Sequence, residues 1–248
     1  MSSAYLLVSH GSRDPRPEIA MQQLAKLVCN KLPKNHNPSN SEHLVGIATL
    51  EMSPQPLHEQ IQQFAKSAFC ERKLSQNQNR LKIVPLFLLP GVHVMTDIPA
   101  EVALAQQALG QDIMIELQPY LGSHPNLDKL LAKQTADIKA EAWILLAHGS
   151  RRPGSKETVE AMAASLPAVA AYWAVPPSLQ SRVKELVADG YKEIAILPYF
   201  LFAGGITDAI AASIEELKLQ FSAVNFQLAE PLGASAELAE IIWDLTDR

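Results

Sequence analysis

Cysteine is scarce in this chain, with two among 248 residues, and no long apolar run is present. Cys29 and Cys70 fall in stretches with helical periodicity and show neither a pairing pattern nor metal-ligand spacing, so we interpret them as reduced core thiols of a cytoplasmic protein. The most apolar stretch, residues 194–206, is too short to span a membrane and contains Pro198 and two glycines. Because no basic region precedes the first apolar residues, we expect no signal peptide.

Three common catalytic or nucleotide-binding motifs are also missing. The sequence contains no Gly-x4-Gly-Lys-Ser/Thr loop, no Gly-x-Gly-x-x-Gly after its first apolar run, and no Gly-x-Ser-x-Gly elbow. These absences disfavour P-loop ATPases, dinucleotide-dependent enzymes and serine hydrolases. The net charge of −5 argues against a general nucleic-acid binder.

Short apolar runs alternate with amphipathic stretches along the whole chain. Buried parallel strands have short unbroken apolar runs, and their alternation with helices predicts parallel sheets covered on both faces. The predicted strands are 4–9, 44–50, 82–88, 112–117, 142–147, 168–174, 193–198 and 225–228. The predicted helices are 17–31, 54–71, 98–109, 125–137, 155–166, 177–188, 207–221 and 235–245. Ser53 is the expected N-cap of the helix that begins at Pro54.

Four sequence landmarks occur twice in the same order, which predicts an internal duplication. The first of them reads His-Gly-Ser-Arg in both halves. The landmark pairs are 10–13 with 148–151, 85–91 with 198–204, 96–97 with 207–208, and 119–122 with 231–233. We therefore divide the chain into residues 1–137 and residues 138–248, each an α/β lobe on a four-stranded parallel sheet.

Three polar residues follow successive predicted strands of the first half, namely His10, Glu51 and His93. The carboxyl ends of parallel strands meet at one edge of a sheet, where α/β proteins bind their ligands. Two imidazoles and a carboxylate suit a borderline divalent metal such as Fe²⁺, Co²⁺ or Ni²⁺. Three protein ligands also leave coordination positions open for substrate atoms.

The second half lacks this set of residues. His148 is present, but Glu51 corresponds to Ala174, and a two-residue gap removes the counterpart of His93. We therefore place the active site in residues 1–137. The alternative is structural, because a histidine at a strand end is often a hydrogen-bonding core residue, and a carboxylate is favoured near the start of a helix.

The ordered motifs resemble the sirohydrochlorin chelatase family of class II, ATP-independent chelatases, in its long two-domain form. The residues that carry the resemblance are His10–Arg13, Leu50-Glu51, Pro85–His93, Asp97–Pro99 and Leu121–Pro125, with degenerate echoes in the second half. The resemblance implies two flavodoxin-like lobes, chelatase-like, with a cleft between them. It also implies insertion of Fe²⁺ or Co²⁺ into sirohydrochlorin, giving sirohaem or a cobalamin precursor, with the metal as a substrate and no organic cofactor.

The resemblance also implies roles for individual residues. His10 and His93 match metal-binding histidines, His10 also matches a proton acceptor, and Glu51 matches an acidic active-site residue. His124 lies near a family position that is often histidine. The loop that lines the tetrapyrrole corresponds to Leu88, Leu89, Pro90, Gly91 and Val92.

The chemistry of the substrate adds further expectations. Sirohydrochlorin is ringed with carboxylates, so cationic side chains should lie at its binding site. The first candidate is Arg13. The others are Arg16, which is also in the active half, and Arg151 and Arg152 in the second half. We expect a cytoplasmic monomer that binds neither nucleic acid nor membrane. The alternatives are a non-catalytic carrier of metal or tetrapyrrole and a chelatase for another tetrapyrrole, and the sequence does not choose between iron and cobalt.

Overall fold

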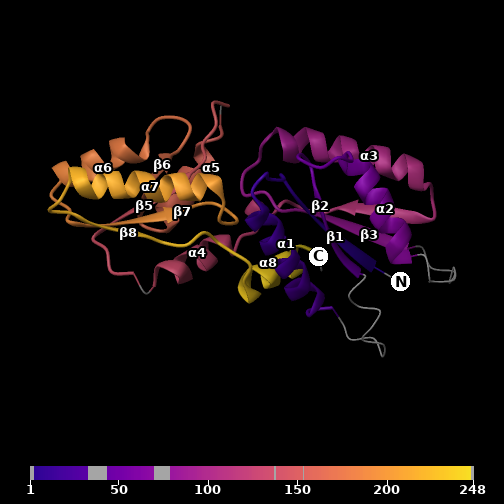
Figure 1. The fold of residues 1–248 in the computed structure, drawn as a ribbon. Coiled ribbons are helices and arrows are strands. Elements are labelled where there is room, and N and C mark those ends of the chain that lie inside the picture. The colour runs from indigo at the N-terminus through magenta and orange to yellow at the C-terminus, as the bar shows by residue number, and fades with distance from the viewer. Residues whose placement is uncertain (1–2, 33–43, 70–78, 137, 153, 247–248) are drawn as a thin grey trace. The chain divides into compact units, whose positions relative to one another are not determined.

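The computed structural model describes residues 3–32, 44–69, 79–136, 138–152 and 154–246. The chain forms two compact units (Figure 1). Unit 1 comprises Met1–His124 and Ala234–Arg248, and unit 2 comprises Pro125–Gly233. Each unit is built on one parallel sheet of four strands, so the predicted fold class of two tandem α/β lobes is confirmed.

The sheet of unit 1 has the strand order β2-β1-β3-β4. Its strands are β1 (Ser3–Ser9), β2 (Val45–Thr49), β3 (Asn79–Pro85) and β4 (Ile113–Leu117). Every residue of β1 from Ala4 to Val8 is buried, because this central strand is covered on both faces. The unbroken apolar run in the sequence therefore has its cause in burial on two sides.

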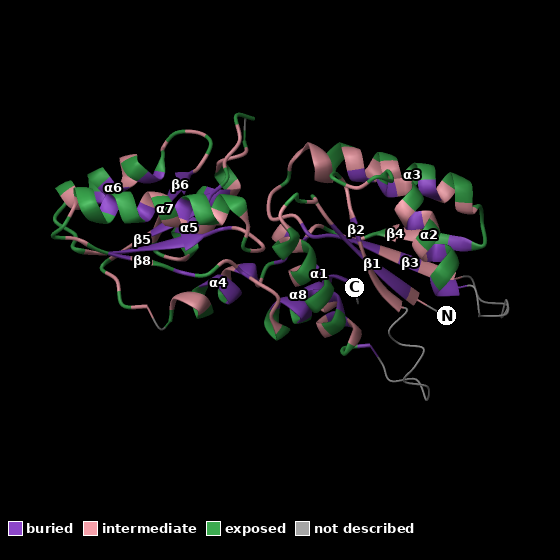
Figure 2. Ribbon diagram, in the orientation of Figure 1, coloured by how far each residue is buried: buried purple, intermediate pink, exposed green. Residues whose placement is uncertain are grey.

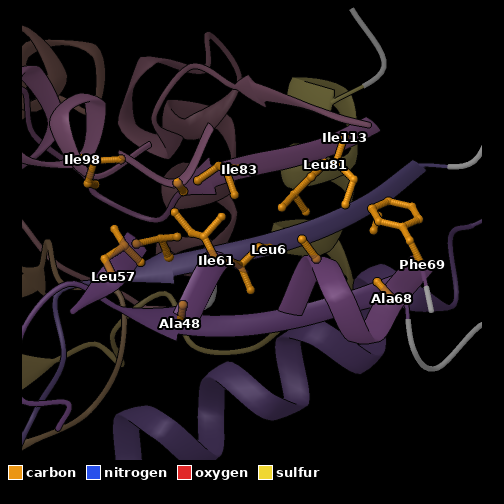
Figure 3. Close-up of a cluster of buried hydrophobic side chains, with 14 residues drawn as sticks. Leu6, Ala48, Leu57, Ile61, Ala68, Phe69, Leu81, Ile83, Ile98 and Ile113 are labelled. Atoms are coloured by element: carbon orange, nitrogen blue, oxygen red, sulfur yellow. The ribbon is translucent and has the colours of Figure 1, made fainter. Parts of the chain in front are cut away.

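Two layers of helices cover this sheet. The helices are α1 (Pro15–Cys29), α2 (Leu57–Phe69), α3 (Ile98–Leu109) and α8 (Ala236–Thr246). On one face, Leu6 of β1 shares a core cluster with Leu57 of α2 and Ile98 of α3 (Figure 3). On the other face, the ring of Tyr5 lies 5.7 Å from that of Trp243 in α8, measured between centroids. Successive side chains of β1 thus point into different helical layers, as the alternation of a strand requires.

Unit 2 repeats this plan with the strand order β6-β5-β7-β8. Its strands are β5 (Ala142–Ala147), β6 (Ala168–Tyr172), β7 (Glu193–Pro198) and β8 (Asn225–Leu228). Its helices are α4 (Leu127–Thr135), α5 (Glu157–Ser165), α6 (Leu179–Ala188) and α7 (Gly205–Gln220). Ile144 of β5, Val183 of α6 and Ile210 of α7 belong to its core cluster. Figure 2 shows the buried residues gathered along the strands of both units.

The last helix of each sequence repeat packs in the other unit. Helix α4 follows β4 but belongs to unit 2, where Gln134 donates from Nε2 to the backbone oxygens of Pro231 and Leu232 at 3.3 and 3.4 Å. Helix α8 follows β8 but belongs to unit 1, where Leu238 and Ile242 are fully buried. The compact units therefore divide differently from the predicted boundary at residues 137/138. The cause is packing, which decides which sheet a terminal helix covers.

The packing of α4 in unit 2 and of α8 in unit 1 leads to a testable prediction about stability. We expect Ile242→Ala in α8 to destabilise unit 1 by about 2–5 kcal/mol, because it leaves a cavity at a fully buried position. Leu131→Ala in α4, at an equally buried position, should destabilise unit 2 instead. Hydrogen exchange measured separately for the β1 and β5 amides distinguishes the two effects. Faster hydrogen exchange of the β5 amides in the Ile242 variant, with the β1 amides unchanged, would contradict the packing of α8 in unit 1.

Several predicted helices begin one to three residues later than expected, and the largest difference is at the helix predicted to begin at Pro54. The helix predicted over residues 54–71 is observed as α2, which starts only after Pro56. Proline disfavours the helical conformation of the residue before it, so Gln55 is not part of a helix and α2 begins after Pro56. Ser53 is therefore not the N-cap of α2, and its hydroxyl instead accepts a hydrogen bond from the backbone N–H of Gln55 at 3.2 Å.

The cysteines and the search for membrane-spanning helices can now be compared with the structure. Cys29 is half-buried at the end of α1 and forms no disulfide within the described part of the chain. Cys70 lies outside the described residues. None of the helices in the described segments combines the length and the apolar character that crossing a bilayer requires.

Candidate metal centre

Backbone pairing brings His10 and Glu51 side by side. The parallel ladder between β1 and β2 continues past the ends of both strands. The N–H of Leu50 donates to the carbonyl of Ser9 at 2.9 Å, and the N–H of Glu51 donates to the carbonyl of His10 at 2.8 Å. The two functional side chains therefore emerge at the same edge of the sheet, as the sequence pattern predicted.

Gly11 allows this close approach. Its φ of +99° lies in the left-handed region, where a side chain is strained. A Cβ atom at this position would lie 2.1 Å from the carbonyl oxygen of Glu51. The glycine of the first His-Gly-Ser-Arg motif is therefore required by the backbone that carries the carboxylate.

The loop after β3 carries His93 to the same edge. Its first residue, Leu86, donates from its N–H to the carbonyl of Val8 at 2.7 Å. The short helix η4 (Leu121–Ser123) supports the middle of the loop, where the N–H of Gly122 donates to the carbonyl of Phe87 at 2.8 Å. A Cβ atom on Gly122 would lie 1.9 Å from the carbonyl oxygen of Leu88, so loop and turn are in direct backbone contact.

A single turn of π-helix, η3 (His93–Asp97), follows the loop and leads directly into α3. The N–H of Ile98 closes this turn by donating to the carbonyl of His93. Sequence analysis did not predict this turn, and the two-residue gap of the second repeat falls between Gly91 and Thr96, where the turn begins. Such turns occur frequently at functional sites.

The three predicted residues form one group. One ligand atom from each of His10, Glu51 and His93 lies within 4.8 Å of the other two. Nε2 of His10 is 3.8 Å from Oε2 of Glu51, and Nε2 of His93 is 3.9 Å from Oε1 of the same carboxylate. The two imidazole rings meet edge to face, with centroids 4.9 Å apart. These are distances at which modest side-chain movement would let all three bind one ion.

The group is open to solvent. The exposed fractions of the side chains are 51% for His10, 44% for Glu51 and 32% for His93. A dication can therefore reach the ligand atoms without any rearrangement of the core. The arrangement suits temporary binding of a metal, whereas a structural site is closed by a complete set of buried ligands.

Asp97 is a residue of this site that sequence reasoning did not single out as functional. Its Oδ2 lies 2.7 Å from Nδ1 of His93. The signal available in the sequence was the spacing, because residues four apart in a helical turn lie on one face. Phe87 also lies beside this imidazole, with ring centroids 6.1 Å apart.

Arg13, Arg16 and His124, which the sequence also pointed to, are not part of the three-residue group. Arg13 is exposed in the loop that follows β1. Arg16 is paired with Asp14, because its Nη2 donates to the Asp14 carboxylate at 2.5 Å. This hydrogen bond, together with one from the backbone N–H of Arg16, lowers the pKa of Asp14 to about 2. His124 is buried, with Nε2 3.9 Å from Oδ2 of Asp244 in α8, and it is not a member of the three-residue group.

The predicted ring-lining loop is partly exposed. Leu88, Leu89, Gly91 and Val92 are of intermediate burial, and Pro90 is exposed. No atom lies within 4 Å of the place a Cβ on Gly91 would occupy. Among the described residues of unit 1, no side chain therefore fills the space beside this glycine.

Unit 2 has the same backbone and different side chains at the corresponding edge. The N–H of Ala174 donates to the carbonyl of His148 at 2.9 Å, just as Glu51 pairs with His10 in unit 1. This register supports the predicted correspondence of Glu51 with Ala174. Helix α7 starts directly at Gly205, without a π-turn before it. Within the described segments, the group around His10 is the one set of three metal-ligating side chains that lie together.

Comparison with known proteins identifies the family. The sequence profile of the CbiX family matches residues 4–138 and 142–248, which together are nearly the whole chain. The chain belongs to the CbiX family. The resemblance noted in the sequence is thereby confirmed, and the break between the matched segments lies where the repeat divides.

Individual members and solved structures agree with this placement. A sirohydrochlorin ferrochelatase of Priestia megaterium is 28% identical over 184 residues, which are 69% of this chain and 68% of that protein. A sirohydrochlorin cobaltochelatase of the same organism is 24% identical over 176 residues, which are 64% of this chain and 57% of that protein. The structure of SirB from Bacillus subtilis with Fe³⁺ has a TM-score of 0.75 at 22% identity, over 100% of this chain and 95% of that one. The CbiX chain described here thus shares the fold of SirB.

Proposed function

We propose that this protein is an ATP-independent chelatase that inserts Fe²⁺ or Co²⁺ into sirohydrochlorin. The observation that carries the proposal is the convergence of His10, Glu51 and His93 at one sheet edge in a member of the CbiX family. Relatives named for iron and for cobalt support both metals as substrates. Fe²⁺ and Co²⁺ are neighbours in the Irving–Williams order, so a site of this kind binds them with similar affinity.

Metal capture is the first step of the proposed mechanism. Neutral imidazoles of His10 and His93 supply nitrogen ligands, and the carboxylate of Glu51 reduces the positive charge of the site. Three ligands leave coordination positions for the pyrrole nitrogens of the incoming macrocycle. An incomplete, exposed set of this kind also lets the ion leave, which a transfer enzyme requires.

Proton removal accompanies the transfer. The macrocycle loses two pyrrole N–H protons while it gains one dication, so the charges balance; one proton passes to the protein and the second to the water that reaches this exposed site. We assign His10 as the acceptor of the first proton, once the ion has passed from its ring nitrogen to the macrocycle, because an imidazole nitrogen can accept a proton and this ring is half exposed to water. Glu51, 3.8 Å from that imidazole, is placed to stabilise the imidazolium that forms.

The remaining assignments concern the substrate and the setting. Leu88, Leu89, Pro90, Gly91 and Val92 would line the face of the macrocycle, and Arg13 would bind one of its carboxylates. The open space beside Gly91 supports close approach of a flat ring to the backbone. In this proposal catalysis belongs to unit 1, no organic cofactor takes part, and the protein acts as a cytoplasmic monomer.

Turnover is the decisive test of the proposal. Under anaerobic conditions, limiting protein should convert many equivalents of sirohydrochlorin in the presence of excess Fe²⁺ or Co²⁺, as followed by absorbance. Conversion that stops at one equivalent per protein would identify a carrier instead. Conversion of protoporphyrin in preference to sirohydrochlorin would identify a chelatase for another tetrapyrrole.

A further inference from the structure

We propose that Asp97 is a positioning residue that fixes the tautomer and the orientation of His93. The inference deepens the proposed function, because it concerns a histidine that would bind the metal substrate. It rests on the contact of 2.7 Å between Oδ2 of Asp97 and Nδ1 of His93, and on the π-helical turn that joins the two residues.

The contact determines which nitrogen faces the metal site. A neutral imidazole carries one proton, and a carboxylate accepts a hydrogen bond only from the nitrogen that holds it. Asp97 therefore places the proton of His93 on Nδ1. The lone pair is then on Nε2, the atom that lies 3.9 Å from Oε1 of Glu51 and faces the ligand group. Without Asp97, the tautomer with a proton on Nε2 becomes available, and that tautomer cannot bind a metal through this atom.

The π-turn supplies the geometry. His93 and Asp97 lie at the two ends of η3, and the turn sets both side chains on one side of the chain. The carboxylate is 39% exposed and the imidazole 32% exposed, so neither group is held by surrounding core packing. Their mutual contact acts together with the neighbouring rings of His10 and Phe87 to restrict rotation of the imidazole, and it is the contact that distinguishes the two ring nitrogens.

Unit 2 contains a natural control for this residue. Asp208 occupies the position that corresponds to Asp97 in the sequence repeat, within the first turn of α7. The second repeat has no histidine equivalent to His93. A charge-removing substitution at Asp208 therefore alters the same residue type in the same kind of helical start, without touching the ligand group.

A second control lies in unit 1 itself. Oε2 of Glu101 in α3 is 2.8 Å from Nδ1 of His58 in α2, which gives a histidine–carboxylate pair of nearly the same geometry. Oε2 of Glu101 also accepts from the backbone N–H of His58 at 2.8 Å. Neither residue belongs to the three-ligand group. Breaking this pair should change stability and leave metal affinity as it is.

The test measures Co²⁺ affinity and the imidazole tautomer in the full-length protein. We expect Asp97→Ala to weaken Co²⁺ binding by about 10- to 100-fold, the usual effect of removing such a partner of a metal-binding histidine. Asp97→Asn, which keeps an acceptor oxygen but no charge, should lose less. Nitrogen NMR of the metal-free protein should show His93 with its proton on Nδ1 in the unaltered chain, and a shift toward Nε2 in Asp97→Ala. Asp208→Asn and Glu101→Gln should leave both readouts unchanged.

The outcomes are separable from those of the proposed function. Both readouts use Co²⁺ alone or no metal, so they remain valid even if sirohydrochlorin is not converted. Co²⁺ affinity in Asp97→Ala within about twofold of the unaltered protein would overturn the inference. So would weaker binding with an unchanged tautomer. If Asp97→Ala does not fold, Asp97→Leu, which keeps the approximate size of the side chain but has no acceptor, provides the same two measurements.

Discussion

Alanine at His10 or at His93 is expected to reduce the rate of Co²⁺ insertion into sirohydrochlorin by about 100-fold or more. Each substitution leaves two of the three side chains that meet within 4.8 Å at the edge of the unit 1 sheet. The His10 variant also lacks the proposed proton acceptor, so its maximal rate should fall even at saturating metal. The His93 variant should show mainly a weaker apparent affinity for the metal.

His148→Ala is the matched control, because the same His-Gly-Ser-Arg motif surrounds it in unit 2. Ala174 lies beside His148 in place of a carboxylate, so the His148→Ala variant should keep most of the activity. Initial rates at several Co²⁺ concentrations, with folding checked by circular dichroism, separate these cases. Full activity of the His10 variant, or equal losses in the His10 and His148 variants, would be incompatible with a single centre in unit 1.

The parts of this molecule that sequence reasoning predicted share one physical basis. A parallel strand buried on both faces has to be apolar throughout, so runs such as residues 4–8 mark strands directly. The polar residue that follows each run then lies at the ligand-binding edge of the sheet. Because three such residues in the first repeat are His10, Glu51 and His93, their meeting could be predicted without any knowledge of side-chain positions.

The parts that sequence reasoning missed depend on contacts that the residue types themselves do not mark. The pattern of α8 shows that one face is apolar, but not that Ile242 is buried in unit 1 and not in unit 2. The π-turn differs from an α-helical turn by one backbone hydrogen bond, from Ile98 to His93, which no residue type marks. The pairing of Arg16 with Asp14, two residues away, is a local contact that the sequence alone did not show.

Gly11→Ala is expected to have a large effect for a single added methyl group, because it combines a backbone clash with a positive φ. Its Cβ would lie 2.1 Å from the carbonyl oxygen and 2.9 Å from the carbonyl carbon of Glu51, at a φ of +99°. Backbone strain and overpacking together should lower the free energy of unfolding of unit 1 by about 2–6 kcal/mol. In molecules that stay folded, the strand end must move away from β1 and carry Glu51 with it. We therefore expect Co²⁺ affinity to fall as well.

Gly110→Ala separates the two causes. This glycine also has a positive φ, +66°, but no atom lies within 4 Å of the position its Cβ would take. Gly110 combines this φ with a ψ of −142°, a conformation that residues other than glycine rarely adopt, so backbone strain alone should cost about 1–3 kcal/mol, and Co²⁺ affinity should not change. Urea unfolding and Co²⁺ titration of both variants give the comparison. Equal losses of stability with unaltered Co²⁺ binding in Gly11→Ala would mean that the contact between Gly11 and Glu51 does not position the carboxylate. A loss of binding confined to Gly11→Ala would mean that the backbone of the His-Gly-Ser-Arg motif, as well as its histidine, builds the metal site.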